Sequence, residues 1–214
     1  MKTKSQASLF GVTESAHPTF EFFSLPGADL RYCQHYFSSV EADQLYEQLR
    51  EEIKWEQHHI RIAGIERAQP RLSAWYGDAD AHYAYSGLRL QPALWTASLL
   101  KLKHQLEASC HAQFNSVLLN LYRDQNDSMG WHADDEKELG PYPIIASLSL
   151  GASRDFLIKH KTEARLKHKI TLEHGSLLVM EGAMQSHWLH TIAKQKELLG
   201  PRLNLTFRYI HHSK

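Results

Sequence analysis

The pattern that decides the fold of this chain is WHADDE, residues 131–136, and within it the pair His132 and Asp134. In an extended segment, side chains two residues apart point to the same face. The pair therefore presents an imidazole and a carboxylate side by side, and both groups bind metal ions. Alone the pattern is weak, because the chain has 15 histidines and a loop histidine near acids is usually solvated or hydrogen-bonded.

A metal site needs a third ligand, and the best candidate is His190, in the segment QSHWLH at residues 185–190. Two histidines and one carboxylate on one face of an octahedron leave three positions open. Non-haem Fe(II) oxygenases use this ligand set. The sequence therefore predicts that His132, Asp134 and His190 converge in the folded chain.

Length and composition are those of a globular protein with one substantial core: 214 residues, of which 43% are hydrophobic. The formal net charge is zero, so any nucleic-acid binding must come from local basic patches. Cys33 and Cys110 form no CxxC pair, which suits a reducing compartment. Neither a signal peptide nor a membrane-spanning run is recognisable. We expect a monomer of the cytoplasm, or of the nucleus in a eukaryote, that is not secreted.

Two helices are predicted ahead of the β-rich half. Residues 1–27 are mostly polar and are expected to form a flexible N-terminal arm. Ser38 and Glu41 have the spacing of a capping box, which predicts that a helix begins there and continues to about residue 53. A second helix is predicted between residues 92 and 108. Its apolar side would consist of Trp95, Leu99, Leu102 and Leu106.

From residue 115 onward the sequence is typical of short strands separated by glycine and proline. The predicted strands are residues 117–122, 144–150, 154–159, 169–172, 176–180, 188–192 and 202–209. Many short strands at regular spacing indicate a sandwich or barrel. We therefore expect an α+β protein with a jelly-roll core, also called a double-stranded β-helix, preceded by helices.

The last predicted strand separates two kinds of side chain on its two faces. The polar face carries Arg202, Asn204, Thr206 and Arg208, and the other face is apolar. Two arginines without an acid suggest a cavity for anions, because guanidinium groups fit carboxylates. The alternative, an edge strand with a solvated cationic face, is preferable on this strand alone. Asn120 and Tyr122 form a second polar pair on one face and can donate to a carboxylate.

Together, these motifs resemble the AlkB family of Fe(II)/2-oxoglutarate dioxygenases, most closely its DNA-repair branch. The resemblance extends from about residue 64 to residue 210 and includes further short segments. They are Pro70-Arg71, Tyr76-Gly77-Asp78, Ser86-Gly87, residues 144–154 and residues 174–178. Each motif is weakly specific, whereas the whole set in this order is highly specific.

The resemblance implies roles for the residues already singled out. His132, Asp134 and His190 would hold Fe(II), and 2-oxoglutarate would chelate it, with O2 as the second cosubstrate. Arg208, helped by Asn204, would pair with the inner carboxylate of 2-oxoglutarate. The far carboxylate would meet Arg202, Asn120, Tyr122 and Thr206. The reaction implied is oxidative demethylation of N-alkylated bases such as 1-methyladenine and 3-methylcytosine, with release of formaldehyde.

The substrate side follows from the same resemblance. A base in a duplex must be flipped out to reach a buried metal. Tyr85 and the ring of His132 would stack on it, and Asp135 would accept from its exocyclic amine. The rest of the pocket would be lined by Arg71, Tyr76, Tyr83 and Glu136. The alternatives are ordinary cross-strand packing for the two tyrosines, and a solvated loop for Asp135 and Glu136.

Two further segments bear on the nucleic acid. Residues 159–169 carry Lys159, Lys161, Arg165, Lys167 and Lys169 against Glu163 alone, which predicts a phosphate-contacting hairpin. The alternative is a solvated surface. The hairpin tip at residues 62–64 has Ala63 where duplex-acting relatives carry an aromatic residue, and this leaves single strands or RNA open. The effect of Trp131 on the site is open.

The domain organisation expected is an arm at 1–27, then helices and a nucleotide-recognition lid at 28–112. The jelly-roll dioxygenase core follows at 113–214, as one structural unit with the segment before it. The main hypothesis is a demethylase of alkylated DNA. The alternatives are the same chemistry on RNA, and a jelly-roll protein that binds metal or nucleic acid without oxidative turnover.

Overall fold

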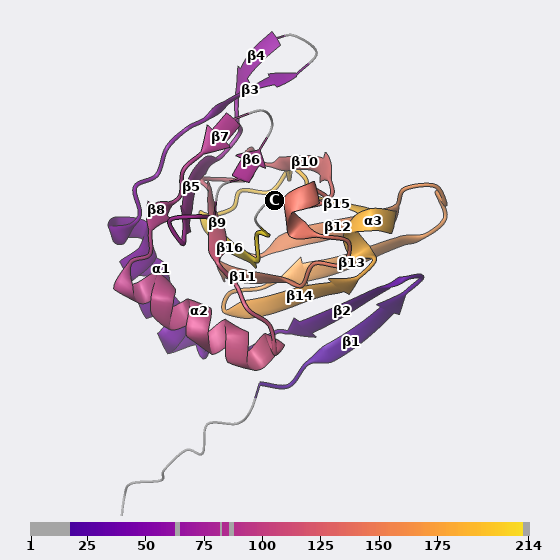
Figure 1. Cartoon of the computed structure of the whole chain (residues 1–214), viewed down its shortest axis with the longest axis horizontal. Coiled ribbons are helices and arrows are strands. Elements are labelled where there is room, and N and C mark those ends of the chain that lie inside the picture. Colours follow the sequence, from indigo (N-terminus) through magenta and orange to yellow (C-terminus); the bar gives the residue numbers. More distant parts are fainter. Residues whose placement is uncertain (1–17, 63–64, 82, 86–87, 212–214) are drawn as a thin grey trace, which may run out of the picture.

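Two β-sheets form the body of the protein, as Figure 1 shows for a computed structural model. The structure describes residues 18–62, 65–81, 83–85 and 88–211, with the backbone alone at 60–62, 83–85 and 88–90. In spatial order, the larger sheet consists of β1 (Glu21–Leu25), β2 (Ala28–Cys33), β14 (Ser176–Gly182), β11 (Ile145–Gly151), β16 (Arg202–Arg208), β9 (Ser116–Tyr122), β5 (Leu72–Gly77) and β8 (Ala93–Leu94). The smaller sheet consists of β10 (Met129–His132), β15 (Trp188–Ile192), β12 (Arg154–His160) and β13 (Lys167–Leu172).

The two long helices lie along the larger sheet (Figure 1). α1 (Ser39–Glu52) begins at the predicted cap: the Ser38 side chain accepts from the backbone N–H of Glu41, whose carboxylate accepts from the backbone N–H of Ser38. α2 (Ala97–Cys110) begins five residues later than predicted, because Ala93–Leu94 forms β8 and Thr96 caps the helix. Trp95 therefore precedes the helix, whereas the other predicted apolar residues are buried. They are Leu99, Leu102 and Leu106.

The larger sheet has an apolar core on each face. Its outer face packs against the helices through the odd-numbered residues of β16, Leu203, Leu205 and Phe207. Its inner face, with the facing sheet, encloses a second apolar cluster that includes Phe156, Ile158 and Trp188. The two facing sheets form the jelly-roll core that the sequence predicts, and the polar face of β16 is turned to its interior.

The N-terminal arm was expected to extend to residue 27, whereas Glu21–Leu25 forms β1 and pairs antiparallel with β2. Phe23 and Leu25 alternate on one face and pack against the inner apolar cluster, which stabilises this edge strand. The part of the predicted arm at residues 1–17 lies outside the described residues.

Smaller elements surround one end of the sheets. The hairpins β3 (His59–Ile62) with β4 (Ile65–Ala68) and β6 (Tyr83–Tyr85) with β7 (Leu88–Leu90) project there, at the end where β10 lies (Figure 1). The predicted tip residues Ala63 and Gly64 lie outside the described residues. A 3-10 turn, η1 (Lys137–Leu139), and the short helix α3 (Met184–His187) complete the fold. Among the described helices, none has the length and apolarity to span a membrane.

Candidate metal centre and anion pocket

The three predicted metal ligands meet inside the jelly roll. One side-chain ligand atom from each of His132, Asp134 and His190 can be chosen so that all three lie within 4.8 Å of one another. Strand pairing explains this: β10 pairs with β15, and His132 and His190 are directly opposite each other. Their ring centroids are 4.2 Å apart. Asp134 follows two residues after His132. Asp134 is 3% exposed and His190 is 4% exposed, whereas His132 is partly buried.

The electrostatics keep Asp134 and His190 deprotonated at neutral pH. Burial opposes ionisation of Asp134, but the charges of Arg208, His190 and His132 outweigh it and lower the pKa of the carboxyl to about 2. The Nη2 of Arg208 lies 2.9 Å from Oδ1 of Asp134. Burial lowers the pKa of His190 to about 3, so its imidazole is neutral. Metal ligands must be deprotonated, and these two groups meet that requirement.

Hydrogen bonds hold the imidazole of His132 and the backbone of Asp134 in place. The Nδ1 of His132 lies 2.9 Å from the carbonyl oxygen of Gly130, so this nitrogen is the N–H donor. The other nitrogen, Nε2, is then left as the metal-facing atom. The backbone N–H of Asp134 donates to Oε1 of Gln185, which lies on α3 just before β15. Gln185 therefore ties the two ligand-bearing segments together.

Behind the cluster, the polar face of β16 lines the same pocket. Arg202, Asn204, Thr206 and Arg208 all border it, as do Asn120 and Tyr122 of β9. The pairing of the two strands accounts for this, because Arg202 is opposite Tyr122 and Asn204 is opposite Asn120. β16 is a central strand with every residue buried, which excludes the alternative of a solvated edge strand.

Arg202 is a buried cation with unused donors. It is 1% exposed, its Nη2 donates to Oγ of Ser149, and its guanidinium carbon lies 5.2 Å from the centroid of the Tyr122 ring. Its Nε and Nη1 have no hydrogen-bond partner among the described residues. Burial lowers its pKa to about 10. A buried guanidinium with two open N–H groups is a site for an anion.

The chain matches the model of the 2OG-Fe(II) oxygenase superfamily over residues 29–208. It is 42% identical over 188 residues to the alpha-ketoglutarate-dependent dioxygenase alkB homolog 3 of Bos taurus, which covers 84% of this chain and 65% of that protein. It is 37% identical over 207 residues to the DNA oxidative demethylase ALKBH2 of Homo sapiens, over 92% of this chain and 78% of that protein. This chain belongs to the AlkB branch of the 2OG-Fe(II) oxygenases.

Solved structures agree on the fold. A structure described as OsALKBH1 superposes on this AlkB-type oxygenase with a TM-score of 0.59 at 18% sequence identity, over 89% of this chain and all of that one. The chain spans slightly less than two thirds of the length of its alkB homolog 3 relative, at 65%.

Membership of the family implies Fe(II) and 2-oxoglutarate, and the residues of this AlkB-type oxygenase fit both. Two imidazoles and a carboxylate form a donor set for Fe(II). The open N–H groups of Arg202 fit a carboxylate of 2-oxoglutarate. Since Arg208 already contacts Asp134, one cation lies at the metal end of the pocket and a second lies behind it.

Apart from the metal ligand among them, the predicted substrate residues whose side chains are described do not line the metal pocket of the AlkB-type oxygenase. Tyr76 does not line the pocket: it packs in the helix-side core, opposite Val117, and its hydroxyl accepts from the backbone N–H of Lys54. Alternation along β5 turns Trp75, not Tyr76, to the inner side of the sheet, opposite the pocket residue Leu118. The predicted contact of Tyr76 with the substrate base therefore stays a prediction, and the residue lies outside the metal pocket.

Arg71 lies behind the metal pocket, hydrogen-bonded to the pocket residue Asn120. It is 3% exposed and donates through Nε to Oδ1 of Asn120 and through Nη1 to the carbonyl oxygen of Ser128. It therefore supports a pocket residue from behind and does not border the described pocket itself. The reason is its position just before β5, beside the interior side of β9.

Of the remaining predicted substrate residues, Asp135 and Glu136 follow the metal ligand Asp134 in sequence, and two tyrosines have no described side chain. Asp135 is exposed and forms an ion pair with Lys161, whose Nζ lies 3.0 Å from Oδ2. Glu136 is half-buried at the start of η1. The side chains of Tyr83 and Tyr85 lie outside the described residues, although their backbone forms β6.

Some site residues were not predicted from the sequence. Ser147 and Ser149 of β11 hold the polar face of β16: Ser149 accepts from Arg202, and Ser147 accepts from Nδ2 of Asn204. Their alternation with Leu148 and Leu150 was the signal that could have found them.

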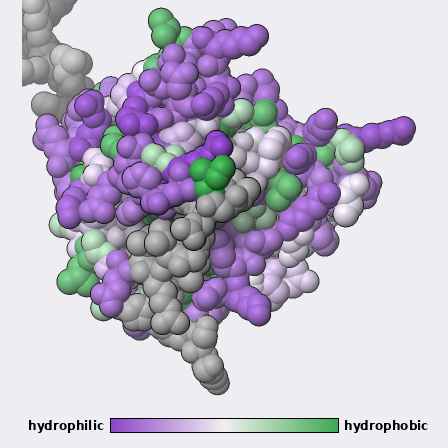
Figure 2. Space-filling model, turned by 90° about the horizontal axis from the view of Figure 1, so that it is seen from above, coloured by the Kyte–Doolittle hydropathy of each residue, from purple (hydrophilic) through white to green (hydrophobic). Residues whose placement is uncertain are grey.

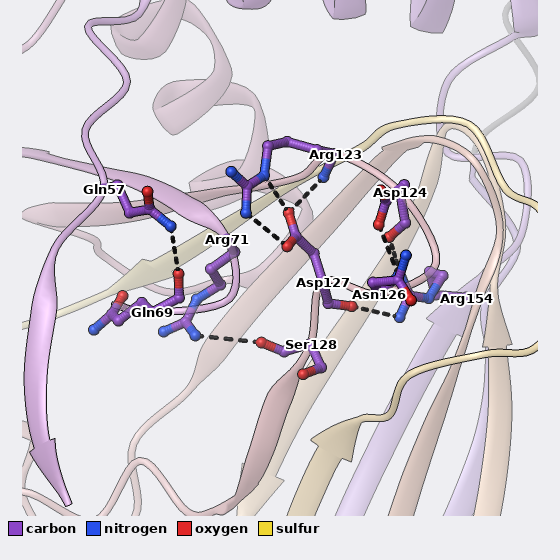
Figure 3. A network of polar contacts seen from close by, with 9 residues as sticks. All are labelled: Gln57, Gln69, Arg71, Arg123, Asp124, Asn126, Asp127, Ser128 and Arg154. Atoms are coloured by element: carbon purple, nitrogen blue, oxygen red, sulfur yellow. Dashed lines mark hydrogen bonds and ion pairs between the residues drawn. The ribbon is translucent and has the colours of Figure 1, made fainter. Parts of the chain in front are cut away.

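Arg154, also missed, holds the segment between β9 and β10. It is 1% exposed and donates to three carbonyl oxygens, those of Asp124, Asp127 and Ala193. Figure 3 shows it reaching this segment, which an Arg123–Asp127 ion pair braces from the other side. The network fixes the path of the chain from Tyr122 to His132.

Proposed function

We propose that this protein is an oxidative demethylase that repairs N-alkylated bases, such as 1-methyladenine and 3-methylcytosine, in DNA. The observation that carries the proposal is the His132, Asp134 and His190 cluster in one pocket with Arg202, whose Nε and Nη1 have no hydrogen-bond partner among the described residues. The name of the human relative, DNA oxidative demethylase ALKBH2, supports DNA as the substrate. The free, buried cysteines Cys33 and Cys110 suit the reducing cytoplasm or nucleus.

His132, Asp134 and His190 would hold the metal. When bound, Fe(II) with 2-oxoglutarate and O2 supplies the oxidation that hydroxylates an N-methyl group, with succinate, carbon dioxide and finally formaldehyde as products. The chain itself contributes binding and orientation. No protein nucleophile or general base is needed, because the hydroxymethyl group leaves the base as formaldehyde.

The pocket residues position the cosubstrate. Arg202 would pair with the far carboxylate of 2-oxoglutarate, assisted by Tyr122 and Asn120, and Ser149 orients the guanidinium. Arg208, through its contact with Asp134, places a cation beside the metal ligands, where the inner carboxylate would lie. Two cations for one dianion offset its desolvation in a closed pocket. Phe156 and Met180 line the same pocket and exclude water.

Nucleic acid would approach at the end that carries the hairpins. Seen from this end, the visible surface is mainly hydrophilic, with hydrophobic residues scattered among polar ones (Figure 2). Such a surface fits a polar partner better than an apolar one. Asp135 and Glu136, just beyond the metal ligands, would favour a methylated base, because alkylation makes the ring cationic.

The test is turnover with purified protein, Fe(II), ascorbate, 2-oxoglutarate and oligonucleotides that contain 1-methyladenine or 3-methylcytosine. We expect formaldehyde, succinate and restored base in equal amounts on DNA, and none with His132→Ala. His104→Ala, the same change on the exposed surface of α2, is the control and should retain activity. Succinate without restored base would keep the oxygenase and reject the substrate, and restoration only in RNA would reject DNA.

A further inference from the structure

The outer face of the smaller sheet carries a groove that the proposed chemistry does not use. Trp131 of β10 borders it, next in sequence to the ligand His132. The indole is 43% exposed, which is unusual for so large an apolar ring. The groove continues over β12 and β13 through Leu157, Lys159, Lys167 and Lys169. We call these five residues the Trp131 groove.

The lysines of the Trp131 groove repel each other and so destabilise the smaller sheet. Lys159 and Lys167 are directly opposite each other on β12 and β13, and like charges in this position are destabilising. Neither has a carboxylate within 4.0 Å among the described side chains, whereas Lys169 pairs with Asp155. The chain as a whole has zero formal charge, so this accumulation does not reflect a general excess of lysine. A bound polyanion would relieve the repulsion.

The aromatic ring and the lysines are in contact. The Nζ of Lys159 lies over the Trp131 ring, 4.3 Å from its centroid. This cation–π contact is worth little at an exposed site. Lysine charges beside an exposed aromatic ring are the elements of a surface for single-stranded nucleic acid, where bases stack on rings and phosphates meet cations.

We propose that the Trp131 groove binds the unpaired DNA strand next to the lesion, with one base stacked on Trp131 and adjacent phosphates on Lys159 and Lys167. The inference rests on the proposed function, since it concerns the same DNA. A base within a duplex has both faces covered by its neighbours, so only an unpaired base offers a face to the indole. The groove therefore favours single-stranded over duplex DNA.

The position of the groove suits this role. β10 is the edge strand of the smaller sheet, and successive residues of a strand point to opposite faces. His132 faces the metal pocket while Trp131 faces outward. A strand that leaves the pocket entrance and passes around the free edge of β10 reaches Trp131 first and the lysines of β12 and β13 next. The ammonium of Lys159 then moves from the ring to a phosphate.

The test is binding without turnover, measured by fluorescence anisotropy of an unmodified labelled oligonucleotide of about 15 nucleotides, as single-stranded DNA, duplex DNA or RNA. Trp131→Ala should weaken binding of single-stranded DNA by about 5- to 150-fold, the range for loss of one stacked base. Binding of the duplex should change less than about twofold, and Trp131→Phe should restore most of the affinity. Lys159→Ala/Lys167→Ala should lower the slope of log K against log salt by about 1.4.

The control variants remove an exposed aromatic ring and two lysine charges outside the Trp131 groove. Tyr142→Ala removes an aromatic ring that is 67% exposed outside the groove, and Lys54→Ala/Lys101→Ala removes two charges from the helical side. If Trp131→Ala binds single-stranded DNA like the wild type, loses as much on duplex, or loses affinity only for RNA, the proposal is overturned. Because binding is read without catalysis, absent demethylation with Trp131-dependent binding would reject the proposed function alone.

Discussion

Replacing Arg202 with methionine separates the stability of this fold from its ability to bind a cosubstrate. The guanidinium is buried, and its Nε and Nη1 lack a hydrogen-bond partner among the described residues. Burial lowers its pKa to about 10, between two and three units below the usual value of an arginine. At about 1.4 kcal/mol per pKa unit, its charged form is destabilised by roughly 3 kcal/mol at neutral pH. This cost exists only while no anion is bound.

Arg202→Met removes that cost together with one charge-assisted hydrogen bond to Ser149, worth about 1.5–3 kcal/mol, and one cation–π contact with Tyr122, worth about 0.5–2 kcal/mol. The contributions nearly cancel. We therefore expect the unfolding free energy of the metal-free protein, measured by urea titration, to stay within about 2 kcal/mol of the wild type. The matched control is Arg154→Met, which is equally buried but loses three hydrogen bonds to carbonyl oxygens. It should lose about 3–5 kcal/mol.

The same Arg202→Met variant should lose the cosubstrate. Calorimetric titration of 2-oxoglutarate into Mn(II)-loaded protein should show affinity reduced by about 30- to 4,000-fold, as for removal of one partner of a buried charge pair. Affinity within about fivefold of the wild type would refute the assignment of Arg202. A loss of stability as large as that of Arg154→Met would refute the claim that its charge is unpaired in the empty pocket.

Asp134→Ala should abolish metal binding, measured by calorimetry. It should also lower the unfolding free energy of the metal-free protein, measured by urea titration, by about 3–5 kcal/mol, because Arg208 loses its buried carboxylate partner. The pKa of His190 is lowered to about 3 and that of Asp134 to about 2, so the unfolded state binds more protons than the folded state as the pH falls. The metal-free protein should therefore be most stable above pH 6.5 and lose stability as the pH falls toward 3. An unfolding free energy that stayed constant between pH 7 and pH 4 would contradict this. Tyr76→Phe should leave the rate of base restoration within about twofold of the wild type, because the side chain faces the helices. Ser149→Ala should raise KM for 2-oxoglutarate by about 3- to 10-fold with kcat nearly unchanged, as for a lost hydrogen bond that orients Arg202.

The residues of the metal centre were predictable because short-range patterns specify them. Alternation within β16 correctly separated Arg202 and Arg208 from the apolar face, and the spacing of His132 and Asp134 put both on one side of the chain. Their convergence with His190 depends on the pairing of β10 with β15. That pairing is a long-range contact, which no local pattern around either strand specifies.

The structure adds most where the local pattern allows two answers. Trp75 and Tyr76 are adjacent aromatic residues, so alternation alone does not decide which one faces the pocket; the pairing of β5 with β9 decides it. In the same way, β1 is a weak, partly exposed strand that exists because β2 supplies its hydrogen-bonding partner. Arg154 carried no recognisable signal, since its acceptors are carbonyl oxygens from two distant segments.

The central claim is that three ligands and a buried guanidinium behind them form one site for a metal ion and a small dianion. The most direct measurement is a crystal structure of the protein prepared without oxygen in the presence of Mn(II) and 2-oxoglutarate. We predict a metal ion about 2.0–2.3 Å from His132, Asp134 and His190, with the far carboxylate of 2-oxoglutarate on Arg202. A metal ion bound elsewhere, or a pocket in which Arg202 keeps both donors open beside bound metal, would contradict the account.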